Sequence, residues 1–162
     1  MEVQPSPISA TEMESRLRRI RAMSLDLGFV GKVEYRHVYS QSGGAQYCIG
    51  PSVDDDIMVV YAEAFDRNAD PEDFSLEAMI AHECGHQRLH RDSKMRKVLT
   101  KFPGDALEEI VASVLGAILL GKSESAQTLK WKAAAELTDL GVTADYARSF
   151  VADLGKLLRN LL

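Results

Sequence analysis

Strand-type and helix-type patterns occupy different parts of this chain of 162 residues. Segments rich in Val, Ile and Tyr lie at residues 32–39, 45–49 and 57–61, with a Gly- and Ser-rich turn between the first two. From Ser75 onwards, apolar residues recur at helical spacing. Strands that come first and helices that come after them are typical of α+β folds. The sequence therefore predicts an α+β fold, with a small antiparallel sheet of about three strands followed by a helical half.

Capping residues, Gly and Pro mark where the helices begin and end. The first helix is predicted from Thr11, which forms a capping box with Glu14, up to Gly28. The later helices are predicted over residues 75–91, 105–120, 125–140 and 143–158. Neither a repeat nor a linker divides the sequence, so residues 1–162 are predicted to form a single domain with its own core.

Charge and cysteine usage argue against several classes of function. The net charge is −5, and the basic cluster at residues 16–21 is typical of a solvated helix face, so no direct nucleic-acid ligand is predicted. Two cysteines, Cys48 and Cys84, do not form a disulfide framework, and Cys84 is expected to be a small buried hydrophobe. The most apolar run, residues 110–120, is too short to span a bilayer. We therefore expect a cytoplasmic protein without membrane contact.

The segment 82–86 reads His-Glu-Cys-Gly-His, an HExxH pattern inside the predicted helix 75–91. Residues four apart on a helix share a face, so the imidazoles of His82 and His86 can bind one metal ion. Neutral imidazole suits Zn²⁺, and Glu83 would lie where it can take a proton from a water at that ion. The alternative is a helix with two surface histidines, but its small and apolar neighbours indicate a buried helix.

A catalytic zinc site has three protein ligands and one open position. His90 would lie about 12 Å along the helix from His82, too far for both to bind one ion, so His90 is expected beside the site or facing substrate. The third ligand is expected to be a carboxylate of the next helix, Glu108 or Glu109. Glu109 is favoured because it shares its helix face with small residues that allow close approach, whereas Glu108 lies on a bulkier face.

HExxH, followed in the next helix by Glu109 in the pattern Glu-x-x-Ala-Ser, resembles the gluzincin arrangement and in particular the ImmA/IrrE family of small metallopeptidases. The resemblance covers about residues 57–120 and includes a leucine-rich stretch after the second motif. It implies that Glu109 is the third zinc ligand and that Ser113, four residues on, steadies a ligating histidine. Ser113 stands where the family usually has Asn, which weakens this second role because a hydroxyl is shorter.

The resemblance implies a zinc-dependent endopeptidase that hydrolyses a peptide bond in a protein substrate, for which a separate transcriptional repressor is one candidate. Glu83 would act as general base and then as general acid. Independently of the resemblance, the edge strand of the sheet is expected to bind the substrate by strand addition, and if residues 57–61 are that edge, specificity pockets would lie along them. A donor to the developing oxyanion is also needed, and the candidates are His37, Tyr39, Tyr47, Tyr61 and His90.

Two functions from other classes compete with this interpretation. The first is a non-catalytic module that keeps the zinc fold and acts through contact with a partner. An intact Glu83 argues against it, because a scaffold does not need that carboxylate. The second is a metal-free helical interaction protein, which the metal content of the purified chain would identify.

Overall fold

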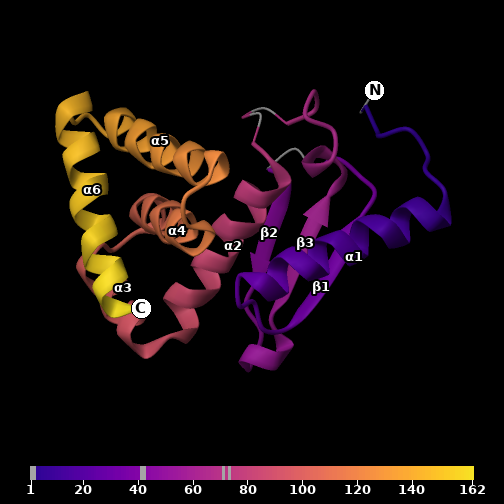
Figure 1. Cartoon of the computed structure of the whole chain (residues 1–162), viewed down its shortest axis with the longest axis horizontal. Helices are drawn as coiled ribbons and strands as arrows, with labels where there is room; N and C mark the ends of the chain where they lie inside the picture. Colours follow the sequence, from indigo (N-terminus) through magenta and orange to yellow (C-terminus); the bar gives the residue numbers. More distant parts are fainter. Residues whose placement is uncertain (1–2, 41–42, 71, 73) are drawn as a thin grey trace.

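The computed structural model describes residues 3–40, 43–70, 72 and 74–162 (Figure 1). The α+β prediction is confirmed over these residues, because a small sheet with α1 forms one half and a set of helices forms the other. The helices are α1 (Ala10–Asp26), α2 (Leu76–Arg91), α3 (Ser93–Lys101), α4 (Asp105–Leu120), α5 (Glu124–Asp139) and α6 (Ala144–Leu161). The strands are β1 (Lys32–Arg36), β2 (Ala45–Cys48) and β3 (Ile57–Tyr61), with short 3-10 turns at Val53–Asp55 and Ala62–Ala64.

The sheet is mixed, whereas the sequence predicted antiparallel pairing. Its strand order is β1-β3-β2, with β3 parallel to β1 and antiparallel to β2. The prediction that residues 57–61 form an edge strand is therefore wrong. Met58, Val59 and Val60 are at most 2% exposed, and so apolar a strand is stable in the centre, where both of its faces are covered. The two edges belong to β1 and β2.

Side-chain caps decide where the helices begin. Ser9, rather than Thr11, accepts a hydrogen bond from a backbone N–H of the first turn of α1. Ser75 caps α2 in the same way, and Asp92 caps α3, which the sequence did not predict. Because Asp92 itself has an extended backbone, the chain changes direction between α2 and α3.

Helices α2 and α4 touch each other through their backbones. A Cβ atom placed on Gly85 would lie 2.4 Å from the carbonyl oxygen of Ala112, and one placed on Gly116 would lie 2.7 Å from that of Ala81. Neither glycine therefore has room for a side chain. The small residues on this face of α4 indicated such a close approach, and it brings the start of α4 against the HExxH segment of α2.

Helix α2 lies between two apolar cores (Figure 1). Ile80 and Cys84 pack with the sheet and α1, while Leu89 packs with α3, α4 and α6. Cys84 is 2% exposed and burial raises the pKa of its thiol to about 12, as expected for a small hydrophobe. Among the described helices, none combines the length and the apolar character that crossing a membrane requires.

Candidate metal centre

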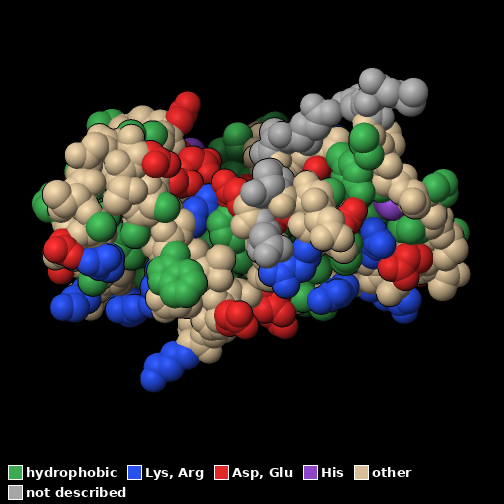
Figure 2. Space-filling model, turned by 90° about the horizontal axis from the view of Figure 1, so that it is seen from above, with side chains coloured by type: hydrophobic (Ala, Val, Ile, Leu, Met, Phe, Trp, Pro, Cys, Tyr) green, Lys and Arg blue, Asp and Glu red, His purple; other side chains and the backbone are tan. Residues whose placement is uncertain are grey.

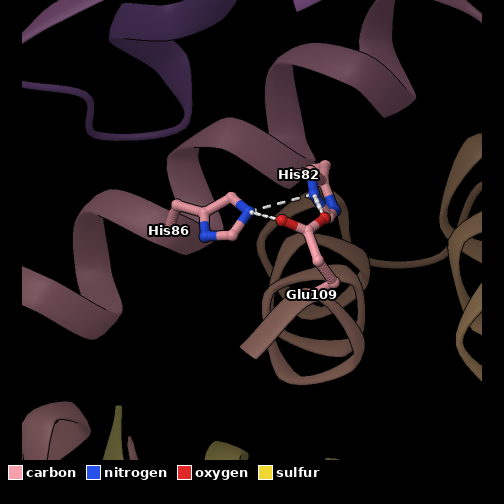
Figure 3. A group of neighbouring side chains, drawn as sticks. All are labelled: His82, His86 and Glu109. Atoms are coloured by element: carbon pink, nitrogen blue, oxygen red, sulfur yellow. Dashed lines mark hydrogen bonds and ion pairs between the residues drawn. The ribbon is translucent and has the colours of Figure 1, made fainter. Parts of the chain in front are cut away.

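Two imidazoles from α2 and one carboxylate from α4 point toward a common centre (Figure 3). His82 Nε2 lies 2.8 Å from Glu109 Oε2, His86 Nε2 lies 3.1 Å from Glu109 Oε1, and the two Nε2 atoms are 3.1 Å apart. Tetrahedral zinc with bonds of about 2.0–2.1 Å separates its ligand atoms by about 3.3 Å. The three donors are therefore spaced so that small side-chain shifts would let them hold one such ion.

The Nδ1 atom of each histidine, which faces away from the common centre, is also hydrogen-bonded. His82 Nδ1 lies 2.9 Å from Oγ of the fully buried Ser113, and His86 Nδ1 lies 2.8 Å from Glu108 Oε2. When Nε2 binds a metal, Nδ1 carries the proton and donates it to these oxygens, which fixes the tautomer and the ring orientation. The serine reaches its histidine despite its short side chain, because α2 and α4 are in backbone contact.

Glu108, the alternative ligand, lies outside the three-donor group. Its carboxylate is hydrogen-bonded to His86 Nδ1 and also lies 3.1 Å from His90 Nε2. The His90 ring faces that of Tyr47 with 6.3 Å between their centres. Among the described residues, His90 does not belong to the group that could hold a metal, which contains only His82, His86 and Glu109. Glu108 thus connects a candidate ligand to the next histidine along α2.

The protonation of these groups reflects their mutual contacts. Burial lowers the pKa of His86, but its hydrogen bond with Glu109 and the charges of Glu83 and Glu108 outweigh burial and raise this pKa to about 9. Burial acts on Glu109 in the opposite direction, yet hydrogen bonds with His82 and His86 hold the pKa of that carboxyl well below its usual range. Glu109 is therefore ionised at neutral pH, the form in which a carboxylate binds a cation.

Glu83 lines the same space without belonging to the three-donor group. Loss of solvent raises the pKa of its carboxyl, while the charges of His82 and His86 oppose that shift. The backbone of Tyr47 in strand β2 also contributes a hydrogen bond to it. A raised pKa suits a group that must first take a proton and then give it away.

A cleft of about 670 Å³ opens onto these groups. Its volume is in the range of small-molecule and peptide-binding pockets. Acidic side chains gather between the helical half and the sheet on the face shown in Figure 2. The lining of the cleft includes Tyr47 in β2, Glu72 and Phe74 before α2, Glu83 and His90 in α2, and Lys132 in α5.

The structure separates the five candidates for an oxyanion donor. Tyr47 and His90 line the cleft, but the Tyr47 hydroxyl already donates to Asp56 at 2.6 Å. The other three lie outside the described lining of the cleft and have hydrogen bonds elsewhere: His37 with Tyr35 and Ser6, Tyr39 with Asp66, and Tyr61 with Gln46. Cys48, whose sulfur could in principle bind zinc, is likewise not among the described lining residues.

Asp56 is a fully buried acid that the sequence analysis missed. Its carboxylate accepts hydrogen bonds from Tyr47 in β2, the backbone N–H of Gly50, and Gln87 and Arg91 in α2. Burial opposes its ionisation, but these donors, Arg91 foremost, hold the pKa of Asp56 well below its usual range. Asp56 thereby joins the edge strand to the helix that carries both histidines. Three consecutive aspartates precede β3, and nothing in that run shows which one is buried.

The geometry predicts different effects for the two glutamates of α4. Glu109→Ala should abolish stable zinc binding, because it removes a donor atom from a three-donor set. Glu108→Ala should weaken zinc binding only about 10–100-fold, because it releases the orientation of His86 but leaves all donors in place. Zinc content after dialysis, followed by titration against a competing chelator, measures both. A weaker effect at Glu109 than at Glu108 would contradict this ligand assignment.

Comparison with models of protein families, with curated proteins and with solved structures found no match for this chain.

Proposed function

We propose that this chain is a zinc-dependent endopeptidase that hydrolyses peptide bonds in a protein or peptide substrate. One observation carries the proposal: His82, His86 and Glu109 converge within 2.8–3.1 Å of one another in an open cleft that Glu83 also lines. The same ligand set underlies the resemblance to the ImmA/IrrE metallopeptidases. A cytoplasmic location and a separate repressor as substrate belong to this proposal.

The proposed reaction assigns a role to each group around the cleft. Zinc, when bound, would lower the pKa of a water molecule and polarise the scissile carbonyl. Glu83 would take the proton from that water and pass it to the leaving amine. Ser113 and Glu108 would keep His82 and His86 in the orientation that binds the metal.

Strand β2 provides a place for an extended substrate. Within the described parts of the chain it pairs with β3 alone, along one edge, and its residues Ala45, Gln46 and Tyr47 line the cleft. An unpaired edge offers backbone donors and acceptors to which an extended peptide can add as a further strand. Tyr47 of this edge and Glu83 line the same cleft, so a strand added here would run beside the proposed base.

A non-catalytic zinc module is the alternative, and the surroundings of Glu83 argue against it. Loss of solvent raises the pKa of this carboxyl, which means that its surroundings disfavour the ionised form. Burying a carboxyl at this position therefore costs folding free energy. A module that acted only through partner contact would gain nothing from that cost. A general base beside a metal needs such a carboxyl.

Removal and return of zinc tests the proposal. The purified chain should contain about one zinc ion per molecule and should cleave an unfolded protein such as reduced casein. Treatment with a chelator should remove zinc and cleavage together, and one equivalent of zinc should restore both. A chain that holds zinc but cleaves neither casein nor a diverse peptide mixture would support the non-catalytic module, and a chain that binds no zinc would support the metal-free protein.

A further inference from the structure

Lys132 of α5 is the one Lys or Arg among the described residues that line the cleft. Helix α5 and strand β2 lie on either side of α2 in Figure 1, and both contribute to the cleft. An extended substrate placed along β2 would therefore run past the wall that carries Lys132. All other charged side chains of the described lining, apart from the histidines, are carboxylates: Asp70, Glu72, Glu83, Glu108 and Glu109.

Most of these carboxylates are already engaged. Asp70 accepts hydrogen bonds from the backbone N–H groups of Glu72 and Phe74, which shapes the loop before α2. Glu108 and Glu109 are hydrogen-bonded to the histidines of α2. Of the other two, Glu83 is the proposed general base, and the carboxylate of Glu72 pairs with Lys132 itself.

The two partners of the ion pair between Lys132 and Glu72 differ in their exposure to solvent. The two charged groups are 3.0 Å apart, but the Lys132 side chain is 19% exposed whereas that of Glu72 is 52% exposed. The ammonium group of Lys132 also lies 4.7 Å from the centre of the Phe74 ring, which favours a cation at this position. An ion pair with a solvated partner contributes little, so another carboxylate can replace Glu72 at small cost.

Among the described residues that line the cleft, α5 contributes no carboxylate that could pair with Lys132 instead of Glu72. Glu136 lies one helical turn beyond Lys132, and burial raises the pKa of its carboxyl while the Lys132 charge lowers it. Among the described residues no ion pair joins the two, and Glu136 lines a neighbouring hollow together with Ile110 and Leu140. A substrate carboxylate would meet Lys132 with solvent already partly excluded, where a charge pair is stronger than at the open surface.

We infer that Lys132 forms a subsite of the cleft that selects an aspartate or glutamate side chain of the substrate. The inference rests on the proposed endopeptidase function. It identifies the preferred substrate as an extended segment with an acidic residue at one fixed position relative to the cleaved bond. In such a complex the substrate carboxylate replaces Glu72 at Lys132.

Cleavage-site profiling tests this subsite. The zinc-loaded chain is incubated with a peptide mixture prepared from a cell proteome, and the cleaved positions are read by mass spectrometry. The same is done for Lys132→Met, for Lys132→Glu and for the matched control Lys130→Glu on the same helix, after equal zinc content has been verified. We expect Asp and Glu to be enriched at one position for the unsubstituted chain and for Lys130→Glu, lost for Lys132→Met, and replaced by Lys and Arg for Lys132→Glu.

A pair of peptides that differ only by Glu or Gln at the profiled position gives a second measurement. Binding to the Glu83→Gln form should favour the Glu peptide by about fivefold or more, and Lys132→Met in that background should remove the difference. Cleavage without acidic preference, or an acidic preference that survives in Lys132→Met, would overturn the subsite but leave the endopeptidase proposal standing. Absence of cleavage by the zinc-loaded chain would overturn both.

Discussion

Glu83→Gln is expected to leave zinc bound while peptide hydrolysis falls by at least about 10²–10⁴-fold. Glutamine keeps the shape of the side chain but cannot take a proton from water at neutral pH. Zinc should remain, because Glu83 lies outside the group formed by His82, His86 and Glu109. Zinc content and single-peptide turnover, measured on the same preparation, give both values.

Glu77→Gln is the matched control, because Glu77 belongs to the same helix but does not line the described cleft. It should keep both zinc and turnover. Near-normal hydrolysis by Glu83→Gln would show that another group activates the water. Loss of zinc in that variant would instead place Glu83 among the ligands, and the arrangement of the centre would have to be revised.

The second large effect is expected at Asp56. Asp56→Asn should lower the free energy of unfolding by about 3 kcal/mol or more, because it leaves the partly buried Arg91 without its charged acceptor. The exposed Asp54, two residues earlier, provides the control, and Asp54→Asn should change stability by no more than about 0.5 kcal/mol. Urea unfolding followed by circular dichroism measures both values.

The effect of Asp56→Asn should depend on pH in a defined direction. The pKa of Asp56 is depressed in the folded chain, so its charge stabilises the fold above the unfolded-state pKa of about 3.9. This contribution is lost as pH falls through the folded-state pKa. The stability difference between the unsubstituted chain and the variant should therefore be constant above about pH 5 and shrink below about pH 4. A difference that stayed constant down to the acid limit would mean that the Asp56 charge is not what stabilises the fold.

Periodicity and caps were sufficient to predict the fold class, because both are local properties of the sequence. The helix around HExxH begins at Leu76, directly after the predicted Ser75, which caps it, and ends at Arg91 as predicted. The next long helix begins at Asp105 and ends at Leu120, as predicted. The order of the strands was not predictable in this way. It depends on which strand would lose the most free energy by exposing its apolar side chains to water. That comparison involves all three strands in the folded chain, and it places β3 in the centre.

In the candidate site, too, the residues that local sequence patterns indicate were predictable, and the contacts between distant elements were not. His82, Glu83 and His86 follow from spacing on one helix, and Glu109 follows from the small residues on its own face. The contacts of Glu108 with two histidines, the buried Asp56 and the position of Lys132 arise between elements that are distant in sequence. Sequence spacing carries no information about such contacts, so they are visible only in the structure.

The two glycine contacts between α2 and α4 would limit the size of an ion in the proposed centre. Two helices in contact at a single point could rotate about it. Helices α2 and α4 are in contact at both Gly85 and Gly116, about one helical turn apart, and this resists rotation and sliding of one helix against the other. His82 and Glu109 sit on these two helices, so the width of the chelate is a property of the backbone. A large ion such as Ca²⁺, with ligand distances of about 2.3–2.6 Å, would have to push the helices apart. In the proposed centre, the size of a bound ion would thus be limited by two glycines that do not themselves contact the metal.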